Sequence, residues 1–202
     1  MPSMFRRVHP LVALAILVAA ALVLAALGPR EKSLGANVRL VYLHGAWVWT
    51  ALVGYGAAGF AGLIGLLSRR ASWQRTSLAL GQAATLFWIT YLPMSLAVMQ
   101  ASWNGLFLEE PRFRIGLNFA IVAILLQAGI RILRRPDWAS ALNLLFLAGL
   151  AFSLSSSREI MHPSSPIAQS GRWLLQAYFM LLTLTCLAAG WQLTRWLHRF
   201  AP

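Results

Sequence analysis

The sequence predicts an all-α integral membrane protein with six transmembrane helices, folded as a single domain over residues 1–202. Apolar residues make up 59% of the chain and charged residues 11%, whereas charged residues account for about 25% of soluble domains. The mean hydropathy of +0.66 points the same way. Six spans of about 20 residues use about 120 residues, so the rest of the chain suffices only for short loops.

The six predicted spans follow the apolar runs in the sequence. The first run has a basic start and a small-residue end, as a signal peptide does, but it is longer than the usual apolar region of about 7–15 residues. Polar breaks with proline, serine and charged residues favour turns between the runs. The predicted spans are approximately 10–28, 39–67, 77–101, 113–133, 139–155 and 172–197.

The basic residues predict the orientation. With alternating sides, ten of the 17 basic residues fall on the side of the N-terminus and seven on the other side. Because basic residues favour the cytoplasmic side, both chain ends are expected inside (N-in/C-in). Four of the five acids fall on the outer side, as do His44 and His162, so function is expected there. The ten inner basic residues are Arg6, Arg7, Arg69, Arg70, Arg75, Arg131, Arg134, Arg135, Arg195 and Arg199.

Other features exclude several function classes. A net charge of +12 in a soluble protein suggests nucleic acid, but here the arginines stand at the ends of apolar runs, where they anchor helices. The single cysteine, Cys186, permits neither an internal disulfide nor covalent c-type haem attachment. The sequence also lacks the motifs of soluble hydrolases, phosphate loops and metal helices. Nucleic-acid binding and a stand-alone enzyme are therefore not expected.

Two histidines are candidate metal ligands. His44 lies near the start of the second span, whose 29 residues would form roughly 43 Å of helix, longer than a hydrocarbon core of about 30 Å. The small residues Gly45 and Ala46 after it would leave space for a flat ligand. His162 precedes the sixth span. Imidazole is an axial ligand of haem iron, so two histidines from different helices would hold a b-type haem without covalent bonds. Alternatively, each is a solvated or hydrogen-bonded interfacial histidine.

The outer segment after the third span is apolar for a loop. Trp103 and Phe107 would form a hydrophobic platform, or the segment is an interfacial re-entrant one. The adjacent acids Glu109 and Glu110, which precede Pro111, favour a solvated turn.

Two arginines follow this segment, Arg112 and Arg114. Since arginine suits carboxylates, they are candidate partners of haem propionates. Alternatively, they pair with the two acids before them or face water.

In these features the chain resembles the haem-handling cytochrome c assembly proteins of the CcmC/CcsA type. Six-helix CcmC-like members have a histidine at the outer start of span two, a tryptophan-rich "WWD" loop after span three and a second histidine before span six. Here His44, the segment 103–112 and His162 fill these places in the same order. The resemblance covers roughly residues 38–196 and implies a CcmC-like bundle.

Segment 103–112 matches the family's WWD loop only in part. Trp103 and Arg112 match its ends, Phe107 replaces one tryptophan and Glu110 replaces the aspartate, while two other tryptophans are absent. In the family this loop is implicated in holding haem for transfer. The loss of these tryptophans therefore argues against haem transfer to a partner, but not against haem binding.

The surroundings of both histidines are family-like. The tyrosine before the first histidine and the tryptophan after it correspond to Tyr42 and Trp47, with two residues missing between histidine and tryptophan. The second histidine is followed by Pro163 and, further on, by an Arg-Trp pair.

The resemblance implies non-covalent haem b at the outer face of a bacterial inner membrane, handled for cytochrome c maturation. It implies axial metal ligation by His44 and His162, with a haem-accepting or cytochrome partner. The remaining implied cofactor contacts are Trp47, Trp103, Phe107, Arg112 and Arg114.

Two alternatives stay open. The chain is a haem-b electron-transfer subunit in which haem stays bound, which would explain a loop that has lost tryptophans. Otherwise it is a cofactor-free anchor beside other subunits of a larger membrane respiratory or redox complex, since small residues such as those in 54–62 allow close helix packing.

Overall fold

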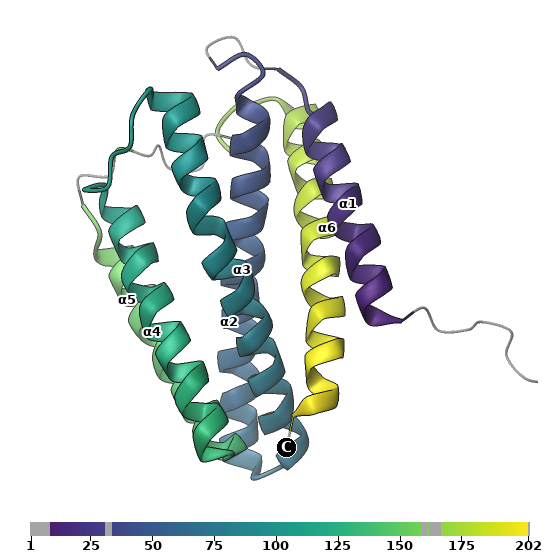
Figure 1. The fold of residues 1–202 in the computed structure, drawn as a ribbon, viewed down its shortest axis with the longest axis vertical. Helices are drawn as coiled ribbons and strands as arrows, with labels where there is room; N and C mark the ends of the chain where they lie inside the picture. Colours follow the sequence, from purple (N-terminus) through teal and green to yellow (C-terminus); the bar gives the residue numbers. More distant parts are fainter. Residues whose placement is uncertain (1–8, 31–33, 159–160, 162–166, 202) are drawn as a thin grey trace, which may run out of the picture.

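The computed structural model describes residues 9–30, 34–158, 161 and 167–201. These residues form six α-helices and a short 3-10 helix (Figure 1). The bounds are α1 Pro10–Leu27, α2 Val38–Ser68, α3 Ala71–Trp103, α4 Pro111–Leu133, α5 Pro136–Ser156, α6 Trp173–Leu197 and η1 His198–Phe200.

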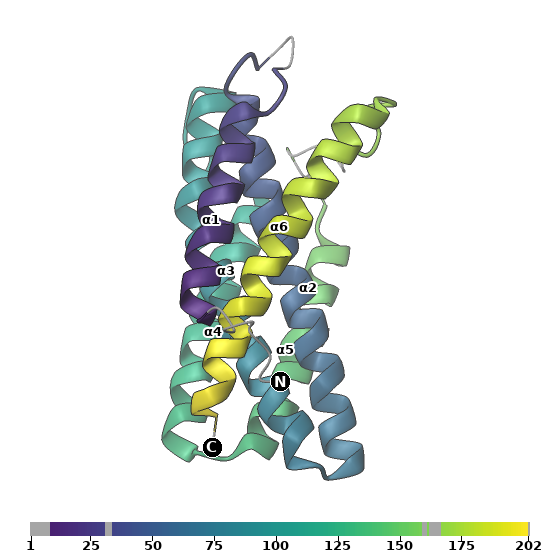
Figure 2. The same cartoon turned by 90° about the vertical axis from the view of Figure 1, so that its right-hand side faces the viewer.

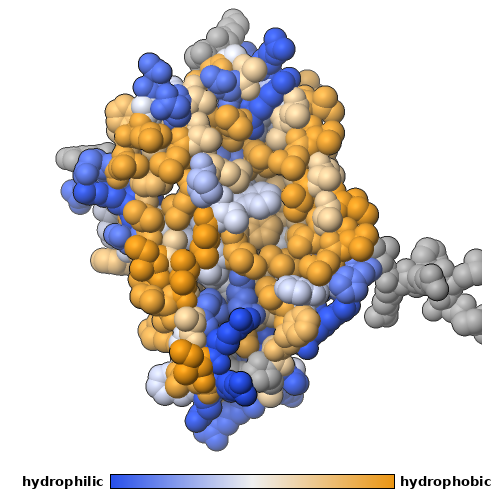
Figure 3. All heavy atoms as spheres, in the orientation of Figure 1, coloured by the Kyte–Doolittle hydropathy of each residue, from blue (hydrophilic) through white to orange (hydrophobic). Residues whose placement is uncertain are grey.

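All six α-helices are long and apolar enough to cross a membrane. Apolar side chains cover most of the middle of the molecule, and hydrophilic residues gather towards both ends (Figure 3). This distribution is consistent with a multi-pass membrane protein and confirms the prediction of an all-α chain with six membrane-length helices.

The α2–α3 hairpin turns more tightly than the hydropathy pattern predicts. Arg69 and Arg70 join the two helices, and Arg69 adopts a left-handed conformation with φ 53°. As a result α3 begins at Ala71, six residues before the span predicted from residue 77. Hydropathy marks where the chain becomes apolar, whereas polar residues such as Gln74 continue the helix beyond that point.

Small residues let α2 lie directly against its neighbours. A Cβ atom added at Gly54 would lie 3.0 Å from the Cβ atom of Ala84 in α3, and one at Gly62 would lie 2.7 Å from the backbone oxygen of Ser140 in α5. Buried polar groups join the same three helices: the Ser77 hydroxyl donates to the Ala58 carbonyl at 2.8 Å, and the Asn143 amide donates to the Ser77 carbonyl at 2.9 Å. Close approach and buried hydrogen bonds are the means by which helices associate in lipid.

α1 packs antiparallel against α6, and the two lie side by side (Figure 2). At one end the Tyr178 hydroxyl donates to the Leu24 carbonyl at 3.0 Å. At the other end Arg199 Nη1 and His9 Nε2 are 3.4 Å apart. The described start of α1 and the end of α6 therefore lie at the same end of the bundle.

The helices differ in length, and this creates a step. α2 and α3 have 31 and 33 residues, whereas α4 and α5 have 23 and 21. The α2–α3 and α4–α5 turns lie at the lower end in Figure 1, and from the upper end of α3 the chain descends to the start of α4. We call residues 104–118, which comprise this descent and the first two turns of α4, the ledge.

Replacing Gly62 by alanine is expected to destabilise the protein. The added methyl group would meet the Ser140 carbonyl, and such overpacking costs about 1–3 kcal/mol. Thermal unfolding of the purified chain in detergent, followed by circular dichroism, measures the effect.

Gly56→Ala is the matched control, since a Cβ atom there meets no described atom within 4 Å. This variant should be as stable as the wild type or gain up to about 1 kcal/mol from helix propensity. Equal stability of the two variants would contradict the packing described for α2.

Candidate functional site

His44 lies in the second turn of α2, at the upper end of the bundle. Its ring packs against Tyr91 of α3, with ring centroids 5.8 Å apart. The residue is half-buried and its Nδ1 atom is buried. The start of α2 is tied to the end of α3, because the Asn37 side-chain amide donates to the Ala101 carbonyl at 3.0 Å.

The small residues beside His44 serve helix packing. A Cβ atom at Gly45 would lie 3.3 Å from the ring of Phe179 in α6, and Ala46 is 0% exposed. The expectation that these two residues leave space for a flat ligand is therefore wrong. Their size instead brings α6 close to α2.

Three rings continue from His44 into the core; we call His44, Tyr91, Trp88 and Tyr55 the aromatic row. Trp88 lies 4.8 Å from Tyr91 and 5.9 Å from Tyr55 between ring centroids. The Trp88 indole donates to the Gly116 carbonyl of α4 at 3.0 Å, and the Tyr91 hydroxyl also lies against Gly116. Through Tyr91, His44 is therefore held near the level of the first two turns of α4.

Trp47, one turn after His44, is part of the α2–α3 contact. Its indole donates to the Thr90 hydroxyl at 2.8 Å, and its ring lies 4.5 Å from that of Phe87 between centroids. The residue thus fixes the helix that carries His44.

Trp103 and Phe107 form an aromatic corner at the start of the ledge. α3 ends after Trp103, where Asn104 adopts a left-handed conformation with φ 54°. The two rings meet edge to face with centroids 5.7 Å apart, and Phe107 remains 38% exposed. The segment therefore turns back on itself and presents an apolar surface.

Glu110 is buried, which corrects the expectation of a solvated acidic turn. It is 4% exposed and caps α4, with its Oε2 accepting from the backbone N–H of Phe113 at 2.7 Å. A carboxylate at this position satisfies an orphan amide and complements the helix dipole. Within the part of the chain that the structure describes, its Oε1 is buried and accepts no hydrogen bond. An acid directly before a proline at the first helical position is the sequence signal for such a cap.

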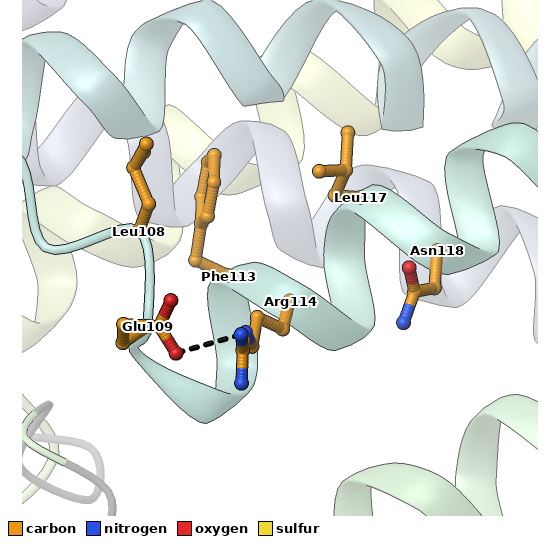
Figure 4. A pocket seen from close by; sticks show the side chains of 6 residues that line it. All are labelled: Leu108, Glu109, Phe113, Arg114, Leu117 and Asn118. Atoms are coloured by element: carbon orange, nitrogen blue, oxygen red, sulfur yellow. Dashed lines mark ion pairs between the residues drawn. The ribbon is translucent and has the colours of Figure 1, made fainter.

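Glu109 and Arg114 form an exposed ion pair on the ledge. Arg114 Nη2 lies 2.6 Å from Glu109 Oε2, with side chains 59% and 82% exposed. The pair lies in a groove of about 610 Å³ (Figure 4), which we call the α4 groove. Arg112 is half-buried beside it. The α4 groove is lined by Leu108, Glu109, Phe113, Arg114, Leu117 and Asn118.

A second pocket of about 400 Å³ lies at the upper ends of α1, α2 and α6. Arg30 and Arg172 make it basic, and Tyr42 forms part of its wall. The Tyr42 ring meets Tyr178 of α6 edge to face, with centroids 5.3 Å apart, so this wall is fixed by the packing of α2 on α6.

The structure places His44, Trp103, Phe107, Arg112 and Arg114 at one end of the bundle. His162 lies outside the described residues, so its place relative to His44 stays a prediction. Among the described residues no group of three His, Cys, Asp or Glu side chains gathers to hold a metal ion. Comparison of the chain with protein-family models and with curated proteins finds no match.

Proposed function

We propose that the chain is a membrane haem-b-binding protein of the cytochrome c assembly type. In this proposal it lies in a bacterial inner membrane and holds haem at the outer face, with His44 and His162 as axial ligands. The observation that carries the proposal is the position of His44: a half-buried imidazole at the level of the ledge, in a bundle of membrane-length helices. Haem b, if bound, would supply an iron, which the imidazoles of His44 and His162 would hold.

The surroundings of His44 fit an axial role. The residue is half-buried and its Nδ1 atom is buried, so His44 lies at the boundary between the core and the surface of the bundle. The ring contact with Tyr91 restricts the ring orientation, and Trp47 fixes the helix through Thr90. An imidazole held in this way loses little freedom when it binds.

The ledge offers contacts for the remainder of the group. The aromatic corner of Trp103 and Phe107 provides an apolar surface for a macrocycle. Arg114 already pairs with Glu109, which leaves Arg112 as the first candidate for a propionate, by a charge-assisted hydrogen bond.

The proposed orientation follows from the two ends of the bundle. Arg69 and Arg70 in one turn and Arg134 and Arg135 in another lie at the end opposite to His44 (Figure 1). Arg199 lies at that end as well, beside the start of α1. This end is the cytoplasmic one by the positive-inside rule, so the ledge faces outwards.

A reduced-minus-oxidised spectrum of the purified protein tests the proposal. The wild type is expected to show a low-spin b-type signal, and His44→Ala and His162→Ala should each lose most of it, because each removes one axial ligand. His198→Ala is the matched control: His198 is exposed at the opposite end of the bundle, and its removal should leave the signal intact. A wild type without haem, or a signal that survives His44→Ala, would overturn the proposal.

Electron transfer through a permanently bound haem is the second candidate function. The observation that favours it is the aromatic row, which leads from His44 through Tyr91 and Trp88 to Tyr55 with centroid separations of 4.8–5.9 Å. Tyrosine and tryptophan rings in such a series offer a route for electrons into the bundle. Haem handling does not require an electron route.

Haem exchange separates the two functions. The haem-loaded protein is mixed with an excess of apomyoglobin, and transfer is followed by the change in the absorption spectrum. The assembly-type proposal predicts that haem leaves for the acceptor, since its function is delivery. Haem that stays bound and cycles reversibly in a potentiometric titration would instead establish the electron-transfer function.

A further inference from the structure

The α4 groove has two chemically different sides. Leu108, Phe113 and Leu117 point to one side, while Arg114 and Asn118 point to the other with Glu109 (Figure 4). The residues of α4 stand four apart on each side, so each side follows one stripe of the helix. The groove is therefore amphipathic: one edge is apolar, and the other carries charged and polar side chains.

The charged side of the groove carries a cationic and an anionic side chain in direct contact. Arg114 and Glu109 are joined by one short contact of 2.6 Å and are largely exposed, so each retains free donor or acceptor capacity towards solvent. The N-terminal amide of Phe113 is already used by Glu110, and the backbone N–H of Arg114 bonds the Glu110 carbonyl at 3.0 Å. An incoming group would thus meet side chains, one cationic, one anionic and one neutral amide.

The groove continues into an apolar surface suited to a lipid chain. Leu117, Ile121 and Leu125 are spaced four residues apart along α4, and all three are exposed. The 23 residues of α4 correspond to about 35 Å of helix, which is close to the thickness of a bilayer core of about 30 Å. The groove at its upper end therefore lies at headgroup depth, with the apolar stripe directed into the bilayer.

We propose that the α4 groove binds the headgroup of an aminophospholipid, phosphatidylethanolamine being the simplest. Arg114 and Asn118 donate to its phosphate, Glu109 accepts from its ammonium group, and one acyl chain follows Leu117 and Ile121. A zwitterionic headgroup matches the paired charges better than an anionic one, because an anionic headgroup leaves Glu109 facing a like charge.

This site would fix the ledge at the membrane surface beside His44. The inference rests on the membrane embedding included in the proposed function, but it does not require haem. Its test contains no haem measurement, so a chain that binds lipid without haem would refute only the haem proposal.

Native mass spectrometry of lipid retention tests the inference. The full chain is placed in nanodiscs with equal amounts of phosphatidylethanolamine and phosphatidylglycerol, and the lipids that stay bound after release are identified. The wild type is expected to retain phosphatidylethanolamine preferentially. Arg114→Gln should reduce this retention about tenfold, since a charge-assisted contact to phosphate is lost. Glu109→Gln should reverse the preference towards phosphatidylglycerol, because the site then carries one positive charge.

Arg131→Gln is the matched control, because Arg131 is an exposed arginine at the other end of the same helix. It should retain lipid as the wild type does, and circular dichroism verifies that every variant is folded. Equal retention of the two lipids by the wild type, or equal behaviour of Arg114→Gln and Arg131→Gln, would overturn the inference.

Discussion

The close approach of α2 to α3 and α5 is the constraint on which the rest of the structure depends. Glycines at 54 and 62 leave room for the Ala84 side chain and the Ser140 backbone, and the buried Ser77 hydroxyl and Asn143 amide tie the three helices together. In lipid, where apolar burial gives helices little reason to associate, such contacts and hydrogen bonds decide the packing. They set the register of α2 against α3, and the two-residue turn at Arg69 and Arg70 keeps that register along the hairpin.

The register places the candidate site. It brings His44 of α2 against Tyr91 of α3, and the Tyr91–Gly116 contact then brings both to the first turns of α4. Because α2 and α3 are longer than α4 and α5, the chain has to descend from α3 to α4, and this descent forms the ledge. A step of this kind at one end of a bundle offers a ligand walls on one side and access on the other. The haem and lipid proposals both use residues of this step.

The six helices could be predicted from the sequence, because six long apolar runs separated by charged turns favour six membrane-length helices. The residues at which the helices begin could not be predicted, because hydropathy does not distinguish a polar first turn, such as that of α3 around Gln74, from a loop. Glu110 was predicted to be solvated, yet it is buried as the cap of α4. Gly45 was predicted to leave space for a ligand, but that space is filled by Phe179. The two errors differ in kind: the cap has a local sequence signal, an acid directly before a proline at the first helical position, whereas the space beside Gly45 depends on which helix packs there and is not encoded in local spacing.

The side of the membrane on which the ledge lies is the central claim, because the proposed haem site requires the outer surface. Single cysteines at Leu106 on the ledge and at Arg70 in the opposite turn, introduced into a Cys186→Ala background that removes the native cysteine, test it directly. In intact spheroplasts a membrane-impermeant maleimide is predicted to label the cysteine at 106 and to reach the cysteine at 70 only after permeabilisation. The reverse pattern, or labelling of both positions from the same side, would contradict the account.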